Sequence, residues 1–349
     1  MFGIPGEDLF VALIGLGGGL LLGLAARLGR FCTLGAIEDA LYGGSDLRLR
    51  MWGVAIGVAV IGSFLLMGTD LLNAGETAYL TRFSLPASVI GGLIFGYGMA
   101  LAGNCGYGAL ARLGGGDLRA FVIVLVMGVA AYVTLSGPLA YLRVVAFPME
   151  PASQTTGIAH GLSGATGLAA PAIGIAIGLA ILAATLAKRA FREERAMIFW
   201  GTVVGLAIVG GWAGTQWVAF ESMGAVPVVS HTFSAPVGET ILYAMTSSGG
   251  GLSFGVGSVA GVWVGAFIGS LIKGHFRWEA CEDPRELRRQ IFGAGLMGVG
   301  AVTAMGCSIG QGLSAMSLLA WSAPITLASI GVGTAFGLRQ LIVGFTPAA

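Results

Sequence analysis

The stretch GGLIFGYGMALAGNCGYG (residues 91–108) joins an apolar run to a cysteine surrounded by glycines. Residues 88–102 contain no charged side chain, as suits a helix in lipid. Glycine releases the backbone from helical geometry at little steric cost, so GNCGYG predicts a break in that helix at Cys105. A cysteine at a break is either a small apolar filler or a thiol available for contact.

The composition of the whole chain excludes an ordinary soluble domain. Only 10% of the 349 residues are charged and 56% are hydrophobic, with a mean hydropathy of +0.87. A soluble domain carries about 25% charged residues, so we expect most of the surface of this protein to face the lipid bilayer. The 61 glycines favour close approach of membrane helices. A net charge of +1 gives no sign of a nucleic-acid partner, and we expect none.

Apolar windows long enough to span a bilayer predict an all-α polytopic membrane protein with about nine transmembrane helices. These windows lie near 9–28, 51–69, 86–105, 120–142, 171–187, 197–219, 252–272, 291–307 and 323–343. Shorter apolar pieces lie at 31–42, 106–116, 239–248 and 308–320. Beside glycine clusters, such pieces indicate re-entrant half helices covered by protein or by a water-filled cavity.

The basic residues predict the orientation. Lysine and arginine gather in 27–50, 112–119, 188–195 and 273–289, whereas 144–170 and 218–240 contain neither. Because basic loops stay in the cytoplasm, nine spans place the N-terminus outside and the C-terminus inside.

Two segments repeat, which predicts one membrane transport domain (1–349) built from pseudo-repeats at about 9–142 and 197–343, linked by 143–196. Residues 91–108 overlay 293–310 without a gap, and six identities include the pair Cys105 and Cys307. A fainter match of 17–29 with 249–261 would place Cys32 opposite Val264. The predicted topology makes this internal repeat inverted, an arrangement of many secondary transporters with broken helices at the midplane. Helix N-termini there would suit an anion.

Three motifs identify a family. GRFCTLGAIEDALYGG (29–44), GYGMALAGNCGYGALARLGGGDLRA (96–120) and LMGVGAVTAMGCSIGQGLSAMS (296–317) resemble the YeeE/YedE family of sulfur-transport membrane proteins. The resemblance covers essentially the whole chain. It implies a bacterial inner-membrane permease that takes up thiosulfate, with an hourglass-like fold and cysteines along a central path. It also implies that any small cytosolic sulfur-carrier partner is a separate chain.

The resemblance assigns substrate contacts to Cys32, Cys105 and Cys307, whereas Cys281 matches no family motif. Other candidate binding or translocation residues at the breaks are Asn104, Gly106, Gly108, Gly310 and Gln311. Asn104 and Gln311 either donate hydrogen bonds to substrate oxygens or cap broken helix ends. The cysteines show no metal-ligand spacing, and we expect no metal, cofactor or catalytic residue. His231 and Glu239 are predicted to be solvated at the outer mouth.

A thiol is a weak donor and a polarisable neighbour, so it can hold the terminal sulfur of thiosulfate without binding it tightly. Several weak sites in series would let the ion step through, with the cysteines as relay sites. A transporter of a selenium compound is the nearest alternative. A membrane thiol or sulfurtransferase enzyme is another, although no CxxC motif supplies a resolving thiol. A structural role explains the broken helices least well.

Overall fold

The computed structural model describes residues 6–148, 157–248, 251–280, 283–342 and 344, and every secondary-structure element there is a helix. Nine of the described helices have 17 to 27 residues. They are α1 (Glu7–Leu28), α3 (Leu47–Gly68), α5 (Leu85–Ala102), α7 (Leu118–Leu135), α10 (Ala170–Leu186), α12 (Arg195–Glu221), α14 (Phe254–Ile272), α15 (Pro284–Thr303) and α16 (Ser322–Ile342).

Each of the nine apolar windows coincides with one of these helices. Within the described ranges, seven helices are long and apolar enough to cross a membrane. The other two fall short because α10 has 17 residues and the first turns of α15 carry Arg285, Glu286, Arg288 and Arg289. The chain is therefore a multi-pass membrane protein.

Two predicted boundaries are wrong by seven residues. Helix α15 begins at Pro284 instead of 291, because Asp283 caps a charged first turn that hydropathy does not detect. The window 120–142 was expected to form a single helix, but α7 ends at Leu135 and a separate helix α8 (Leu139–Ala146) follows. Pro138 lies between them, and proline has no N–H for the helical ladder while its ring clashes with the preceding turn. Tyr141 is 81% exposed, so α8 runs over the outside of the bundle.

The four short apolar segments also form short helices. They are α2 (Thr33–Leu41), α6 (Gly106–Gly114), α13 (Ala235–Thr246) and a helix over 308–317 that contains the π-helical segment η2 (Gly310–Ala315). Further short helices are η1 (Ala74–Glu76), α4 (Ala78–Thr81), α9 (Ile158–Thr166) and α11 (Arg189–Glu193).

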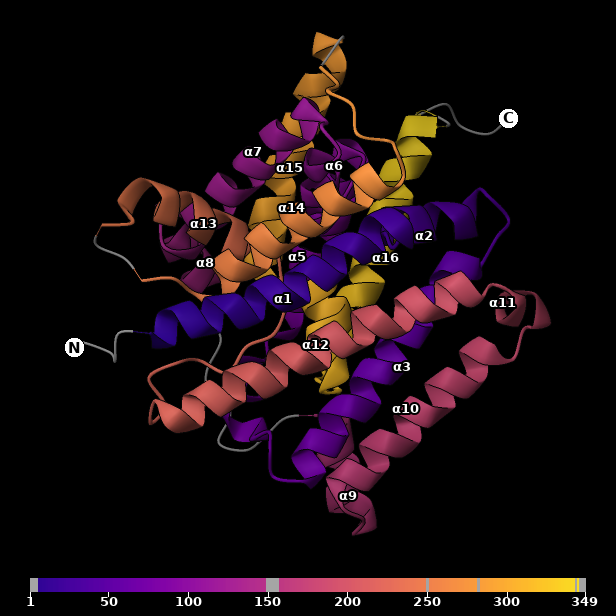
Figure 1. Cartoon of the computed structure of the whole chain (residues 1–349), viewed down its shortest axis with the longest axis vertical. Coiled ribbons are helices and arrows are strands. Elements are labelled where there is room, and N and C mark those ends of the chain that lie inside the picture. The colour runs from indigo at the N-terminus through magenta and orange to yellow at the C-terminus, as the bar shows by residue number, and fades with distance from the viewer. Residues whose placement is uncertain (1–5, 149–156, 249–250, 281–282, 343, 345–349) are drawn as a thin grey trace.

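The long helices pack in an interleaved order, so neighbours in space come from opposite halves of the chain (Figure 1). Helix α1 lies between α14 and α12, and α3 lies between α12 and α10. Helix α5 packs against α15 and α16, while α7 packs against α15 and α13.

Glycines bring the backbones of α5 and α15 together in an antiparallel crossing. A Cβ added at Gly91 would lie 2.6 Å from the Ala304 nitrogen, and one added at Gly293 would lie 2.6 Å from the Ala102 nitrogen. Gly98 faces the Gly293 carbonyl in the same way. The contact is therefore reciprocal: the last residue of α5 lies against the middle of α15, and the residue after α15 lies against the first half of α5.

Candidate translocation site

Each of Cys32, Cys105 and Cys307 lies immediately before the first residue of a short helix. The best-defined break separates α5 from α6. Helix α5 ends where Gly103 adopts a left-handed backbone with φ of 75°, a conformation that glycine takes without strain. Cys105 then caps α6 and accepts a hydrogen bond from the Gly108 nitrogen at 3.4 Å. The glycines therefore hold the Cys105 thiol at a helix N-terminus.

The corresponding break separates α15 from the helix over 308–317. Met305 has a left-handed φ of 59°, which ends the turn before Gly306 and Cys307. The Cys307 sulfur lies 3.6 Å from Thr232 Oγ1 and accepts a hydrogen bond from the Phe233 nitrogen at 3.4 Å. The loop before α13 therefore holds this second thiol.

The first residue of α2 connects the breaks. Thr33 Oγ1 donates to Ser308 Oγ at 3.0 Å and to the Cys105 sulfur at 3.9 Å. Cys105 and Cys307 are 0% and 1% exposed, whereas Cys32 is only partly buried. The three breaks thus meet at one buried centre, with Cys32 on its accessible side.

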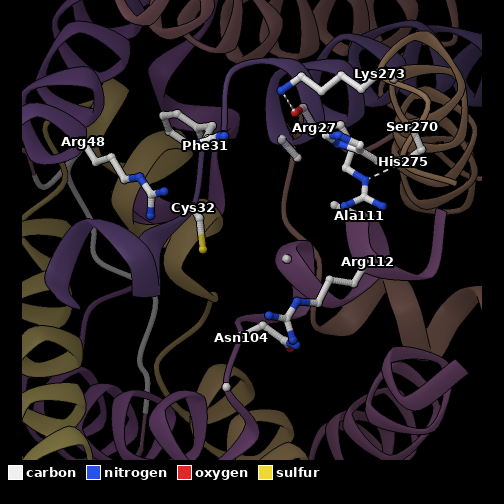
Figure 2. Close-up of a pocket in the computed structure, with 15 residues that line it drawn as sticks. Arg27, Phe31, Cys32, Arg48, Asn104, Ala111, Arg112, Ser270, Lys273 and His275 are labelled. Atoms are coloured by element: carbon white, nitrogen blue, oxygen red, sulfur yellow. Dashed lines mark hydrogen bonds between the residues drawn. The ribbon is translucent and has the colours of Figure 1, made fainter. Parts of the chain in front are cut away.

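A cavity of about 410 Å³ reaches Cys32, and we call it the basic pocket. Among the described residues that line it, none is acidic and five are arginine or lysine: Arg27, Arg30, Arg48, Arg112 and Lys273. Figure 2 shows the Cys32 side chain pointing toward the space that these side chains surround. Asn104 and Gly108 also line the basic pocket.

Local contacts hold part of this positive charge in place. Lys273 Nζ donates to the carbonyl of Arg27 at 2.8 Å, at the C-terminal end of α1, where a cation is favoured by the helix dipole. Arg27 Nε donates to Ser270 Oγ at 2.7 Å, and Arg48 pairs with Asp39 at 3.2 Å. The basic pocket can therefore attract and hold an anion next to Cys32.

A second cavity, of about 440 Å³, lies at the other end of α1, and we call it the acidic pocket. Asp8 and Glu239 line it, together with Thr232, which contacts Cys307. At a rise of about 1.5 Å per residue along α1, Asp8 lies about 28 Å from Arg27. The two pockets therefore open on opposite sides of the buried thiols.

Comparison with known proteins shows the family of this chain. A family model described as sulphur transport matches residues 28–336. The chain belongs to the sulphur transport family. It is 29% identical over 339 residues to the thiosulfate transporter TsuA of Escherichia coli strain K12, covering 93% of each chain. It is also 29% identical over 320 residues to the thiosulfate transporter TsuA of Spirochaeta thermophila, covering 88% of this chain and 93% of the relative. Such relatives indicate a transporter and not an enzyme.

The two candidate amides of this sulphur transport protein differ in their surroundings. Asn104 is 3% exposed and lines the basic pocket, and neither of its amide atoms has a hydrogen-bond partner among the described residues. Gln311 instead donates from Nε2 to the Ala304 carbonyl at 2.7 Å, at the end of α15. Both amide atoms of Asn104 are therefore without a partner, whereas Gln311 uses its Nε2 at the broken helix and only its Oε1 has no partner among the described residues.

The three candidate glycines also have different positions. Gly108 lines the basic pocket and donates its N–H to Cys105. A Cβ at Gly106 would meet the Met127 side chain at 2.6 Å, and a Cβ at Gly310 would lie 2.5 Å from Thr232 Oγ1. Gly106 and Gly310 therefore allow close packing around the thiols. Cys281 lies outside the described residues.

The expectation of a solvated His231 is wrong. His231 is 0% exposed, its Nδ1 lies 2.6 Å from Ser258 Oγ, and its carbonyl accepts a hydrogen bond from Ser314 at 2.6 Å. The loop that carries it folds inward against Cys307, which its polar residues did not indicate. Glu239 does line an open cavity. Thr33 and Ser308 were also missed, although each directly follows a cysteine.

Proposed function

We propose that this chain takes up thiosulfate across a bacterial inner membrane. The observation that carries this proposal is a series of thiol and hydroxyl groups between the two pockets. From the acidic to the basic pocket, the series contains Thr232, Cys307, Ser308, Thr33, Cys105 and Cys32.

The chemistry of thiosulfate fits both parts of this path. Its terminal sulfur is soft and weakly hydrated, so polarisable thiols can hold it at successive weak sites. Its charged oxygens suit the basic pocket and the unpartnered amide of Asn104. Sulfate has no such sulfur and would lack the thiol contacts. The names of both TsuA relatives support thiosulfate as the substrate.

We also propose that all nine long helices cross the membrane as two inverted repeats. In chain order, α1, α3, α5 and α7 of the first repeat correspond to α12, α14, α15 and α16 of the second. Under this correspondence, the contact of α5 with α16 is equivalent to that of α15 with α7, and the contact of α3 with α12 is equivalent to that of α14 with α1. The antiparallel, reciprocal glycine contacts of α5 and α15 support an inverted relation. The four short helices would then be re-entrant, and the two pockets would give the hourglass-like shape.

The positive-inside pattern and an odd number of spans give an outer N-terminus and a cytoplasmic C-terminus. The basic pocket would then be the inner mouth, where imported anions accumulate before release. A separate small cytosolic sulfur-carrier protein is the recipient that we propose.

Cysteine labelling tests this orientation. Met223 is 97% exposed between α12 and α13, and Glu193 is exposed in α11. With a membrane-impermeant thiol reagent and intact cells, we expect Met223→Cys to be labelled above the parent chain and Glu193→Cys to remain unlabelled. Both should react in lysed cells. Labelling of Glu193→Cys in intact cells would contradict the proposed orientation and place α11 outside.

Growth tests the function itself. A bacterium that lacks its own sulfur-uptake systems should grow on thiosulfate when it expresses this chain, because the path supplies both thiols and cationic groups. Parallel cultures on sulfate should not be rescued. Uptake of selenium oxyanions, measured in the same cells, should be weaker than uptake of thiosulfate. Uptake of the selenium compound without uptake of thiosulfate would assign the chain to the alternative substrate.

A further inference from the structure

Of the four short apolar helices, α13 is the one without a cysteine before it. Cys32, Cys105 and Cys307 directly precede the short helices α2, α6 and 308–317, whereas Ser234 precedes α13. Serine differs from cysteine only in having oxygen in place of sulfur. Ser234 therefore stands where the other three short helices have a thiol.

Contacts around Tyr107 relate Ser234 to Cys32. Phe31 precedes Cys32 and Phe233 precedes Ser234, and both rings pack on Tyr107, with centroid distances of 6.5 and 5.5 Å. Helix α2 contacts α3 and α16, while α13 contacts α14 and α7. Because α14 and α7 are the repeat equivalents of α3 and α16, α13 is the equivalent of α2. These contacts pair Cys32 with Ser234, in place of the faint sequence match that paired Cys32 with Val264.

The Ser234 hydroxyl is buried without a partner. A serine at a helix N-cap ordinarily accepts a hydrogen bond from a backbone N–H of the first turn. Ser234 caps α13 but makes no such bond, its side chain is 2% exposed, and its Oγ has no partner in the described part of the chain. Burying an unpaired hydroxyl is unfavourable, so this group is available to a ligand that reaches it.

The residues on either side of Ser234 in the chain contact Cys307 or line the acidic pocket. Phe233 donates to the Cys307 sulfur, and both Thr232 and Ala235 line the acidic pocket. Resting on the transport function proposed above, we propose that Ser234 is a fourth substrate-contact residue, between the acidic pocket and Cys307. A hydroxyl is a stronger donor to oxygen than a thiol, so it binds the oxyanion end while Cys307 holds the terminal sulfur.

Uptake of radiolabelled thiosulfate by proteoliposomes tests this assignment. Ser234→Ala should raise KM about tenfold, because the variant loses a hydrogen bond to a charged group. Ser234→Cys should raise KM by a smaller factor, since a thiol donates weakly. The matched control is Ser63→Ala, because Ser63 in α3 is also fully buried with an unpartnered hydroxyl. Its KM should equal that of the unaltered protein.

The outcomes separate the two proposals. An unaltered protein that transports no thiosulfate would count against the proposed function. If it does transport thiosulfate, an equal KM for Ser234→Ala and Ser63→Ala overturns the role of Ser234. Should Ser234→Ala fail to elute as a folded protein from size-exclusion chromatography, Ser234→Cys decides: a raised KM supports the contact, and an unchanged KM overturns it.

Discussion

Cys105→Ala is expected to abolish thiosulfate-dependent growth while the protein stays folded and inserted. Cys105 is fully buried where the broken helices meet, and Thr33 and Gly108 both contact its sulfur. A packing role alone would cost about 1 kcal/mol of stability, because only one sulfur atom is removed. At the middle of a narrow path, no water can replace the missing thiol, so loss of transport should be complete.

Three further variants make this result specific. Cys105→Ser retains size and a donor but exchanges soft sulfur for hydrated oxygen, so it should also fail. Cys32→Ala and Cys307→Ala should lower uptake without abolishing it, because each lies nearer a pocket with neighbouring donors. Expression and insertion are compared by immunoblot of membranes. Normal growth of Cys105→Ala at matched expression would refute the relay, and equal, total loss in all three alanine variants would indicate covalent chemistry.

Gly293→Leu is expected to prevent accumulation of the folded protein. A Cβ at Gly293 would lie 2.6 Å from both the Ala102 nitrogen and the Gly98 carbonyl, so even alanine requires the backbones to separate. Leucine would force α5 away from α15, and the two thiol-bearing breaks at their ends would separate too. We expect at least a tenfold loss of monodisperse protein after detergent extraction. A tenfold change corresponds to a free-energy cost of about 1.4 kcal/mol for the folded state.

Gly295→Leu is the matched control on the same helix. No atom lies within 4 Å of a Cβ added at Gly295, so leucine there meets open space. Its yield should match that of the unaltered chain in fluorescence-detected size-exclusion chromatography. Equal yields of Gly293→Leu and Gly295→Leu would contradict the close α5–α15 crossing.

Hydropathy and charge were sufficient to predict the long helices. Apolar runs of membrane-spanning length are local properties, and each became a helix with boundaries near those expected. The exceptions are the start of α15, where the first turns are charged, and the end of α7, where Gly137 and Pro138 interrupt an otherwise apolar run. The short helices could be predicted as well, because glycine clusters mark where a helix must stop.

The thiols of the candidate site could be predicted because cysteine is rare here and three glycine-framed motifs carry it. Their surroundings could not. Thr232 and Phe233 lie in a loop far from Cys307 in the chain, and only the folding of that loop into the centre brings them together. His231 was assigned to solvent for the same reason.

The sequence by itself determined that this is a helical membrane protein of a sulfur-transport type, with breaks at Cys32, Cys105 and Cys307. The helical membrane class and the breaks follow from composition and from glycine conformation, which act within a few residues, whereas the sulfur-transport type rests on the resemblance of three motifs to a known family. Only the tertiary structure decided that the basic side chains from four separate segments surround one pocket, and that Ser234 completes the set of broken-helix residues. Packing between distant helices sets those juxtapositions, and no local pattern encodes them.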